Sequence, residues 1–262
     1  MHETSPSVHL IARPSIDLDG MRSYLEDVGG AGWLDRRLEE SAGAPNGGEL
    51  LVEFGGRACY RSWEPGLNVN VTRVRADRRE YFENLLRSAH GSVLEHASYS
   101  FALRNVSRVF THELVRHRAG SAFSQESLRY VRLTDIGFRV PPALEPLRGQ
   151  VLAIVEQLEE FQRSAAAELA IDDEGVPFHV KKEVTSALRR LAPIGLSTDI
   201  VWSANLRTLR HVIQMRTAEG AEEELRSVFD ELASVMVREA PLIFQDFERS
   251  PAGCWEPRYH KV

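Results

Sequence analysis

The sequence predicts one α+β domain, on three observations. The segment 96–103 alternates apolar and polar residues, with Phe101 and Leu103 on one side, as a half-buried strand does. Most of the remaining apolar residues recur at helical spacing instead. The 262 residues contain no repeat, no low-complexity tract and no clear linker. Because this length can bury one large core, we expect a single domain over 1–262.

Two helices and one ambiguous segment are expected in the N-terminal third. Asp19 is a suitable cap for a helix that ends at Gly29. The apolar residues of 77–90 share one face of a second helix. The segment 50–63 opens with an apolar run whose period favours neither a strand nor a short helix. Irregular chain is expected at 43–48 and 68–75.

The centre of the chain is expected to pass from strand to helix to loop. After the alternating strand, the apolar residues of 106–117 have helical spacing. Gly120 and two serines make 119–125 a loop. The segment 128–133 then has strand character.

Four helices are expected in the C-terminal half. Those over 146–169 and 177–191 each have a proline in the first turn, where its missing N–H costs nothing. The spacing of apolar residues predicts that 200–215 is mostly helical. A final helical stretch covers 221–247, and Pro241 should kink or break it.

Composition excludes several classes of protein. The net charge of −6 gives no general field for polyanions. Cys59 and Cys254 form neither a C-x-x-C pair nor a disulfide framework, so we expect a reducing cytoplasm. No signal peptide is visible at the N-terminus, and no run approaches 18 apolar residues, so no membrane association is expected.

Positive charge is concentrated between 104 and 139. Seven arginines oppose three acidic residues there, a local charge of +4 on an acidic chain. The triplet 116–118, Arg-His-Arg, follows the apolar helix, and its mutual repulsion has to be offset by an anion. A small anion suits this pattern better than a long nucleic acid, which rewards an extended basic surface.

Common catalytic and nucleotide motifs do not match. His112 and His117 are five residues apart and cannot share a helix face, so no metal site is expected. Neither a P-loop nor a Rossmann glycine motif occurs, so arginine side chains must hold any phosphate. Ser127 lacks a nucleophile elbow, and Cys59 is expected to be a small packed residue rather than a nucleophile.

Two further basic segments have a structural interpretation that spacing alone leaves open. Arg216 ends a helical stripe of apolar residues, and a long side chain there can extend to solvent without binding anything. Arg189 and Arg190 precede a proline connector, where a solvated helix C-terminus is the commoner situation.

Four segments, taken together and in order, resemble the flavin-dependent thymidylate synthases. The triplet 116–118 followed by Ser127-x-Arg129-Tyr130 resembles the signature of that family. The segment 90–96 resembles its upstream flavin segment, and 107–115 leads into the signature as in the family. Asn205-x-Arg207 with His211 and Arg216 resembles its C-terminal flavin and nucleotide segment.

The resemblance implies an α+β fold with an antiparallel sheet packed with long helices, and a homotetramer with flavin sites between subunits. It implies a methyltransferase that installs a methyl group at C5 of a uridine monophosphate. Methylenetetrahydrofolate would give the carbon, and FAD reduced by NADPH would give the hydride. The residues implied to contact FAD are Ser92, Arg116, His117, Arg118, Gln125, Asn205, Arg207 and His211.

The nucleotide site follows from the same resemblance. The residues implied to hold the pyrimidine nucleotide are Glu113, Arg116, Gln125, Glu126, Ser127, Leu128, Arg129, Arg189 and Arg216. Arg216 would stabilise the negative charge that develops on the ring as C5 becomes nucleophilic. Ser127 would orient the substrate in the catalytic step, so no nucleophile of the enzyme is required.

Two departures from the family bear on the substrate. The segment 119–126 is one residue longer than the usual spacing, and Glu222 stands where the family usually has glutamine. The longer segment resembles the branch that methylates UMP at C5 in nucleoside-antibiotic pathways of the polyoxin type. The sequence therefore leaves dUMP and UMP both open. A non-catalytic protein that binds nucleotides or nucleic acid through the arginine cluster is the alternative from another class.

Overall fold

The computed structural model describes residues 1–43 and 45–262 and divides them into two compact units. Unit 1 comprises 1–9, 102–118 and 123–202, and unit 2 comprises 10–101, 119–122 and 203–262. Each unit is built from three segments because the strands of one sheet run from one unit into the other. The single domain expected from the sequence stays a prediction.

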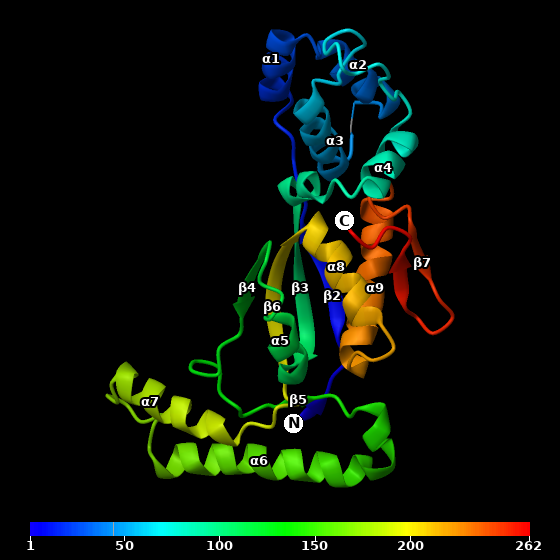
Figure 1. Cartoon of the computed structure of the whole chain (residues 1–262). Coiled ribbons are helices and arrows are strands. Elements are labelled where there is room, and N and C mark those ends of the chain that lie inside the picture. The colour runs from blue at the N-terminus through cyan, green and yellow to red at the C-terminus, as the bar shows by residue number, and fades with distance from the viewer. Residues whose placement is uncertain (44) are drawn as a thin grey trace. The chain divides into compact units, whose positions relative to one another are not determined.

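The main sheet has four strands in the order β2-β3-β6-β4. These are β2 (Ser7–Ala12), β3 (Ser98–Ser107), β6 (Ser197–Asn205) and β4 (Ser121–Gln125) (Figure 1). Backbone N–H groups of Leu206 and Arg108 donate to the carbonyls of Ala97 and Leu196 respectively, so β3 and β6 are antiparallel. The helices and this sheet confirm the α+β class and the antiparallel sheet packed with long helices.

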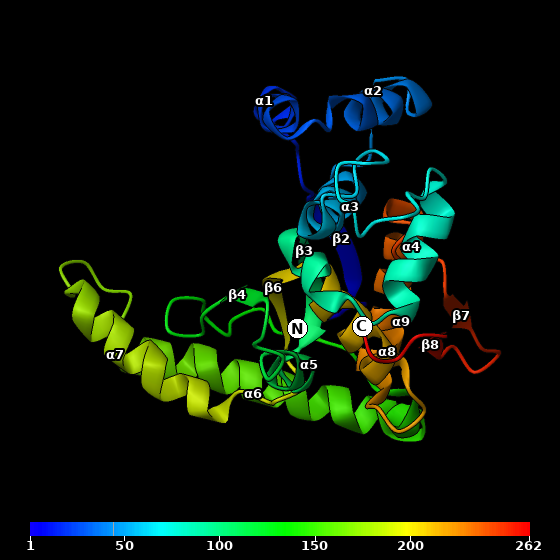
Figure 2. The ribbon, with the colours of Figure 1, turned by 45° about the horizontal axis from the view of Figure 1, so that its top comes forward.

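Unit 2 carries most of the helices. They are α1 (Leu18–Val28), α2 (Ala31–Glu40), α3 (Gly47–Tyr60), α4 (Arg78–Arg87), the 3₁₀ helix η1 (Gly91–His96), α8 (Leu206–Thr217) and α9 (Glu223–Glu239). The hairpin β7 (Phe247–Arg249) and β8 (Trp255–Pro257) follows α9. Leu25, Trp33 and Trp63 belong to the core cluster beneath α1, α2 and α3. Figure 2 shows the same elements after a rotation of 45°.

Unit 1 contains two long helices that lie side by side in both views (Figures 1 and 2). Its elements are β1 (His2–Glu3), α5 (Arg108–Leu114), β5 (Gly137–Phe138), the 3₁₀ helix η2 (Pro142–Leu147), α6 (Arg148–Glu168), α7 (Phe178–Leu188) and the 3₁₀ turn η3 (Arg189–Leu191). The Gln162 amide of α6 donates to the Leu188 carbonyl at the end of α7, at 3.0 Å. No residue of α7 is buried.

The strand and several helices predicted from the sequence are confirmed, with shifted ends. Tyr99, Phe101 and Leu103 are buried on one side of β3, as alternation predicts. Asp17, rather than Asp19, caps α1 by accepting from the Gly20 N–H at 3.0 Å. The α9 helix ends at Glu239, as the following proline predicts.

Two predicted segments are wrong. The expected loop 119–125 contains strand β4, whose partner β6 supplies the backbone hydrogen bonds that its Ser-Ala-Phe-Ser sequence does not suggest. The expected strand 128–133 is a turn, because the N–H groups of 130 and 131 both donate to the Ser127 carbonyl. The segment 200–215 is mostly helical as expected, in helix α8 from Leu206 onward, but up to Asn205 it belongs to strand β6.

The N-terminal segments differ from expectation in two smaller ways. The ambiguous segment 50–63 lies mostly in helix α3. That helix already begins at Gly47, inside the expected irregular segment 43–48, because the Asn46 side chain accepts from the Glu49 N–H at 3.0 Å. Over the described ranges 1–43 and 45–262, no helix combines the length and the apolar character needed to cross a membrane.

Candidate active site

The Arg-His-Arg triplet lies in the turn that ends α5. The Ser107 side chain caps the start of this helix by accepting from the Phe110 N–H at 3.1 Å. At its other end, the N–H groups of Arg116 and His117 donate to carbonyls of the last helical turn. Arg116 and Arg118 are exposed, and His117 and Glu113 are half-buried. Unit 1 thus presents two guanidinium groups to solvent from one short turn.

The segment 125–129 is fixed by the first turns of α5. The Gln125 amide donates to Thr111 Oγ1 at 3.1 Å, and Arg108 Nη2 donates to the Glu126 carbonyl at 3.0 Å. Ser127 Oγ accepts from the Arg129 N–H at 3.3 Å. Leu128, by contrast, is buried in the core of unit 1. The predicted nucleotide residues 125–129 therefore occupy a fixed turn of unit 1.

Arg108 was not singled out from the sequence, although it lies against this turn. Its Nε is buried, and no hydrogen-bond partner for it occurs within residues 1–43 and 45–262. Burial lowers the pKa of the Arg108 guanidinium, the Glu126 carboxylate opposes this, and the charge of Arg189 lowers the pKa further. Arg108 and Arg189 thus place two positive charges near the single carboxylate of Glu126. No sequence signal joined Arg108 to Arg189.

Arg189 adjoins the same turn from the end of α7. It lies in η3 and is exposed. Together with Leu128 it lines a small cavity of unit 1. Arg189 therefore shares a cavity wall with Leu128 and acts electrostatically on Arg108, and its predicted role in nucleotide binding stays a prediction.

The Ala119–Gly120 turn belongs to unit 2 and rests on the start of α8. The Asn205 N–H donates to the Gly120 carbonyl at 3.0 Å, and Thr208 Oγ1 donates to the Ala119 carbonyl at 2.7 Å. Gly120 has φ +67°, and a Cβ there would overlap the Asn205 and Thr208 side chains. Only glycine fits this close approach without strain.

The other predicted flavin residues gather around η1 and α8 in unit 2. Asn205 caps α8 by accepting from the Thr208 N–H at 2.9 Å. Arg207 pairs with Glu95 of η1 at 2.5 Å, both half-exposed. His211 lies one turn after Arg207 and is exposed like it, and Ser92 is exposed on η1. Arg216 is half-buried in the last turn of α8.

These side chains fit a cofactor that carries phosphate. Ser92, Arg207 and His211 are donors that a diphosphate accepts. Arg207 is held by a single exposed carboxylate, so an incoming phosphate can compete for it. A Cβ at Gly91 would lie 3.0 Å from Arg207 Nε, so glycine leaves the room that this arginine uses. The donor set of unit 2 is thus compatible with FAD.

Cysteine and metal chemistry have little support from the geometry. Cys59 is exposed at the end of α3, so the prediction that it packs as a small buried residue is wrong. Cys254 is buried. Within residues 1–43 and 45–262, no group of three or more His, Cys, Asp or Glu side chains could hold a metal ion.

Comparison with known proteins decides the family. Residues 42–242 match the family described as thymidylate synthase complementing protein. The chain belongs to this family. A flavin-dependent thymidylate synthase of Mycolicibacterium gilvum is 39% identical over 212 residues, covering 78% of this chain and 81% of the relative. One of Mycobacterium marinum is 38% identical over 208 residues, with the same two coverages.

A solved structure supports the fold of this thymidylate synthase family member. Thymidylate synthase X of Helicobacter pylori, determined with FAD and dUMP, has a TM-score of 0.55 and 21% identity to this chain. The likeness covers 76% of this chain and 93% of the other. At this identity it shows the fold, and the roles of single residues remain predictions.

Proposed function

We propose that this protein methylates C5 of dUMP, with methylenetetrahydrofolate as carbon donor and FAD reduced by NADPH as hydride source. The observation that carries the proposal is the family match over residues 42–242, with relatives up to 39% identical that are flavin-dependent thymidylate synthases. The hydrogen-bond donors of the two units support the proposal, because FAD and dUMP both carry phosphate.

Each unit carries its own set of side chains predicted to contact FAD. These are Ser92, Asn205, Arg207 and His211 in unit 2, and Arg116, His117, Arg118 and Gln125 in unit 1. Bound flavin, once reduced, supplies the hydride of the reaction. The task of this chain's own residues is to bind and orient the diphosphate, for which arginine forks and hydroxyl donors are suited.

The nucleotide would be held by the turn 125–129, Glu113, Arg116 and Arg189. We add Arg108, because its buried Nε has no hydrogen-bond partner within residues 1–43 and 45–262, and a nucleotide phosphate would accept from it.

Arg216 would stabilise negative charge on the pyrimidine, and Ser127 would orient it. Neither cysteine has to act as a nucleophile in this scheme.

UMP is the substrate variant to be tested against dUMP. The longer segment 119–126 suggested a loose loop that would admit a 2′-hydroxyl. Its Ala119–Gly120 end is hydrogen-bonded to α8, and its Gln125–Glu126 end is hydrogen-bonded to α5. Because both ends are fixed, the reason to expect a looser site weakens and dUMP is favoured. Equal methylation of UMP and dUMP would overturn this preference.

Self-association as a homotetramer is proposed on the same family grounds, and α6 supports it. Ile154 and Phe161 of this helix are 58% and 45% exposed, and Leu158, half-buried, lies one helical turn from each of them. An exposed apolar stripe of this kind suits a protein interface. We expect Ile154→Glu with Phe161→Glu to lower the sedimenting mass, whereas Gln157→Glu on the same helix should not.

The proposed activity is tested on the purified protein. It should carry the visible absorption of oxidised flavin, oxidise NADPH faster when dUMP is present, and release a methylated nucleotide with methylenetetrahydrofolate. A protein that takes up no FAD would refute the proposal. The alternative, a nucleic-acid binding protein, predicts instead an affinity that falls steeply with salt and no methylated product. A cytoplasmic location is part of this proposal.

A further inference from the structure

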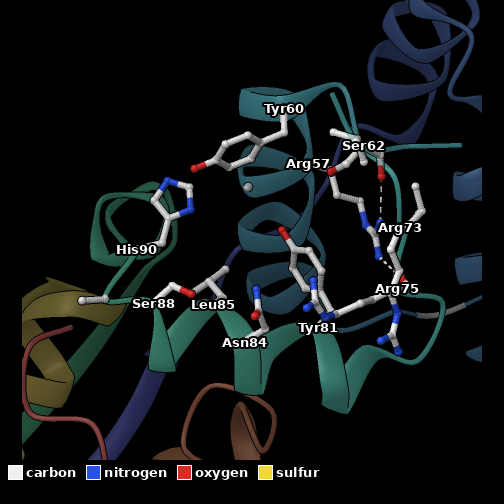
Figure 3. Close-up of a pocket in the computed structure, with 14 residues that line it drawn as sticks. Arg57, Tyr60, Ser62, Arg73, Arg75, Tyr81, Asn84, Leu85, Ser88 and His90 are labelled. Atoms are coloured by element: carbon white, nitrogen blue, oxygen red, sulfur yellow. Dashed lines mark hydrogen bonds between the residues drawn. The ribbon is translucent and has the colours of Figure 1, made fainter. Parts of the chain in front are cut away.

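A cavity of about 390 Å³ lies in unit 2 between α3, α4 and the irregular segment that joins them. No residue predicted for flavin or nucleotide lines it. His90, at one end, directly precedes η1, the element that carries Ser92 and contacts Arg207. Figure 3 shows Tyr60 and His90 at one end of the cavity and Arg73 and Arg75 at the opposite end.

The cavity is built around a buried cation. Arg57 is 1% exposed, and its Nε donates to Glu53 Oε1 at 2.9 Å. Its other nitrogens donate to the carbonyls of Ser62 and Arg75, at 2.9 and 2.7 Å. The guanidinium also stacks 4.4 Å from the centre of the Tyr81 ring. Arg57 thereby fixes both ends of the segment 62–75, which forms one wall of the cavity.

One end of the cavity has more positive than negative charge. Arg73 Nη2 and Arg75 Nε both lie on one oxygen of Glu80, at 2.9 and 3.3 Å. Two guanidinium groups therefore share one carboxylate. Glu80 and Arg73 are 45% and 70% exposed, and ion pairs this exposed contribute little to stability because solvent screens them. An incoming anion can therefore displace Glu80 at little cost.

The opposite end is aromatic. The rings of Tyr60 and His90 meet edge to face, with centroids 5.9 Å apart at 72°. Tyr60 is 56% exposed, so much of its ring surface is open to a ligand. Asn84 of α4 and Ser88, which directly follows α4, lie along the cavity between the two ends and offer polar contacts (Figure 3). A planar ring bound against Tyr60 and His90 would bury this surface.

We propose that this cavity binds an organic anion whose planar ring packs against Tyr60 and His90 and whose carboxylate or phosphate pairs with Arg73 and Arg75. The proposal rests on the proposed function, because both soluble co-substrates have this chemistry. Methylenetetrahydrofolate joins an aromatic ring to the carboxylates of glutamate, and NADPH joins adenine to a 2′-phosphate. The position of His90 beside η1 places the ligand next to the predicted flavin residues of the same unit.

The test is calorimetric titration of the full-length, FAD-loaded protein with two probes. One is p-aminobenzoyl-L-glutamate, and the other is adenosine 2′,5′-bisphosphate. Their uncharged counterparts, p-aminobenzamide and adenosine, serve as ligand controls. The variant Arg73→Gln with Arg75→Gln removes both cations but keeps the Arg75 carbonyl that Arg57 binds. Arg79→Glu changes the charge of the same region equally, on an exposed residue of α4 outside the cavity.

We expect the double variant to bind one probe at least tenfold more weakly, since the charge-assisted hydrogen bonds of both guanidinium groups are lost. Arg79→Glu should bind it as the wild type does. The probe whose affinity falls in the double variant identifies the co-substrate, and Tyr60→Ala should weaken binding of the same probe. Binding of neither probe, or equal binding by wild type and double variant, would overturn the proposal.

Flavin absorption and dUMP methylation separate this inference from the proposed function. If probe binding depends on Arg73 and Arg75 but no methylated product forms, the cavity assignment is supported and the proposed activity is refuted. If methylation proceeds while the double variant binds both probes as the wild type does, the proposed activity is supported and the cavity assignment is refuted. In the supporting case, the double variant should raise the KM of one co-substrate and leave kcat unchanged.

Discussion

Replacing Glu53 with glutamine should destabilise unit 2 more than any other single polar change in it. Glu53 is fully buried and accepts from Trp33 Nε1, from Arg57 Nε and from Arg37 Nε and Nη2 through Oε1. Its Oε2 accepts from Arg37 Nε and from Arg78 Nε at 3.1 Å. Glutamine keeps one acceptor oxygen, places an N–H donor against another donor, and removes the negative charge that neutralises Arg57.

The size of the stability loss depends on which arginine loses its carboxylate partner. In the variant, Arg37 still pairs with Glu40 at 2.9 Å, whereas Arg57 still donates to the carbonyls of Ser62 and Arg75 but has lost its carboxylate. Removing one partner of a buried ion pair costs about 3–5 kcal/mol. Domains are stable by about 5–15 kcal/mol in total, so this loss is a large fraction. Glu40→Gln is the matched control, because Glu40 is 51% exposed and its loss should cost at most about 1 kcal/mol.

The assay is urea unfolding followed by tryptophan fluorescence, to which Trp33 contributes beside Glu53. If the free energy of unfolding of Glu53→Gln lies within about 1 kcal/mol of the wild-type value, the reasoning is refuted, because the buried Arg57 charge would then need no carboxylate. Glu40→Gln shows how much of any loss is due to one missing surface partner.

The pH dependence of this difference has a definite sign. Burial raises the pKa of Glu53, but the guanidinium groups of Arg57 and Arg37 outweigh it, so the pKa lies below its ordinary value. A carboxyl with a lowered folded pKa contributes stability above its unfolded pKa and loses it as pH falls through the folded pKa. The gap between wild type and Glu53→Gln should therefore narrow on acidification from neutral pH. A gap that widens in acid would contradict this assignment.

Three further outcomes are expected in the candidate site. Arg108→Leu should weaken dUMP binding by tenfold or more while leaving flavin absorption intact, because one partner of the proposed phosphate site is lost. Gly120→Ala should destabilise the protein, since its φ of +67° is strained for alanine and its Cβ would overlap the start of α8. Arg216→Ala should lower turnover by about 10²–10³-fold, the usual cost of losing a group that stabilises charge in the transition state.

Each of these has a control or a contrary result. Arg104→Leu, an exposed arginine of β3, should leave dUMP affinity unchanged, and equal weakening by both variants would indicate a non-specific charge effect. Gly149→Ala, where a Cβ meets nothing within 4 Å, should not destabilise. Full turnover by Arg216→Ala would remove its catalytic role.

The sequence predicted the β3 strand and most helices because their signals are local. Alternation in β3 and the glycine that ends α1 are visible within a few residues. Strand β4 was missed because its serines and alanine carry no strand signal, and its hydrogen bonds come from β6, distant in the sequence. In β6, the buried residues Ile200, Trp202 and Ala204 alternate with less buried ones. The apolar residues of α8 begin directly after β6, so the sequence pattern of the strand cannot be separated from that of the helix.

The candidate site divides in the same way. The Arg-His-Arg triplet and the Asn205 segment were found because they form local motifs. Arg108 was counted only as one of several arginines, since its significance depends on Glu126 and Arg189 in other parts of the chain. Likewise, Arg73 and Arg75 lie in irregular chain, and only the Arg57 contacts to Ser62 and Arg75 show that this segment is fixed.

The double anchoring of the segment 62–75 has a consequence for how the protein can vary. Closing a loop costs conformational entropy that grows only slowly with length, by about 0.6 kcal/mol per doubling. Because Arg57 holds both ends through backbone carbonyls, exposed positions between them can vary without loss of closure, whereas Trp63 is fixed by its burial in the core. Substitutions at the exposed positions of this segment should thus alter the cavity wall at small cost to folding. Ligand preference and fold stability can then change independently.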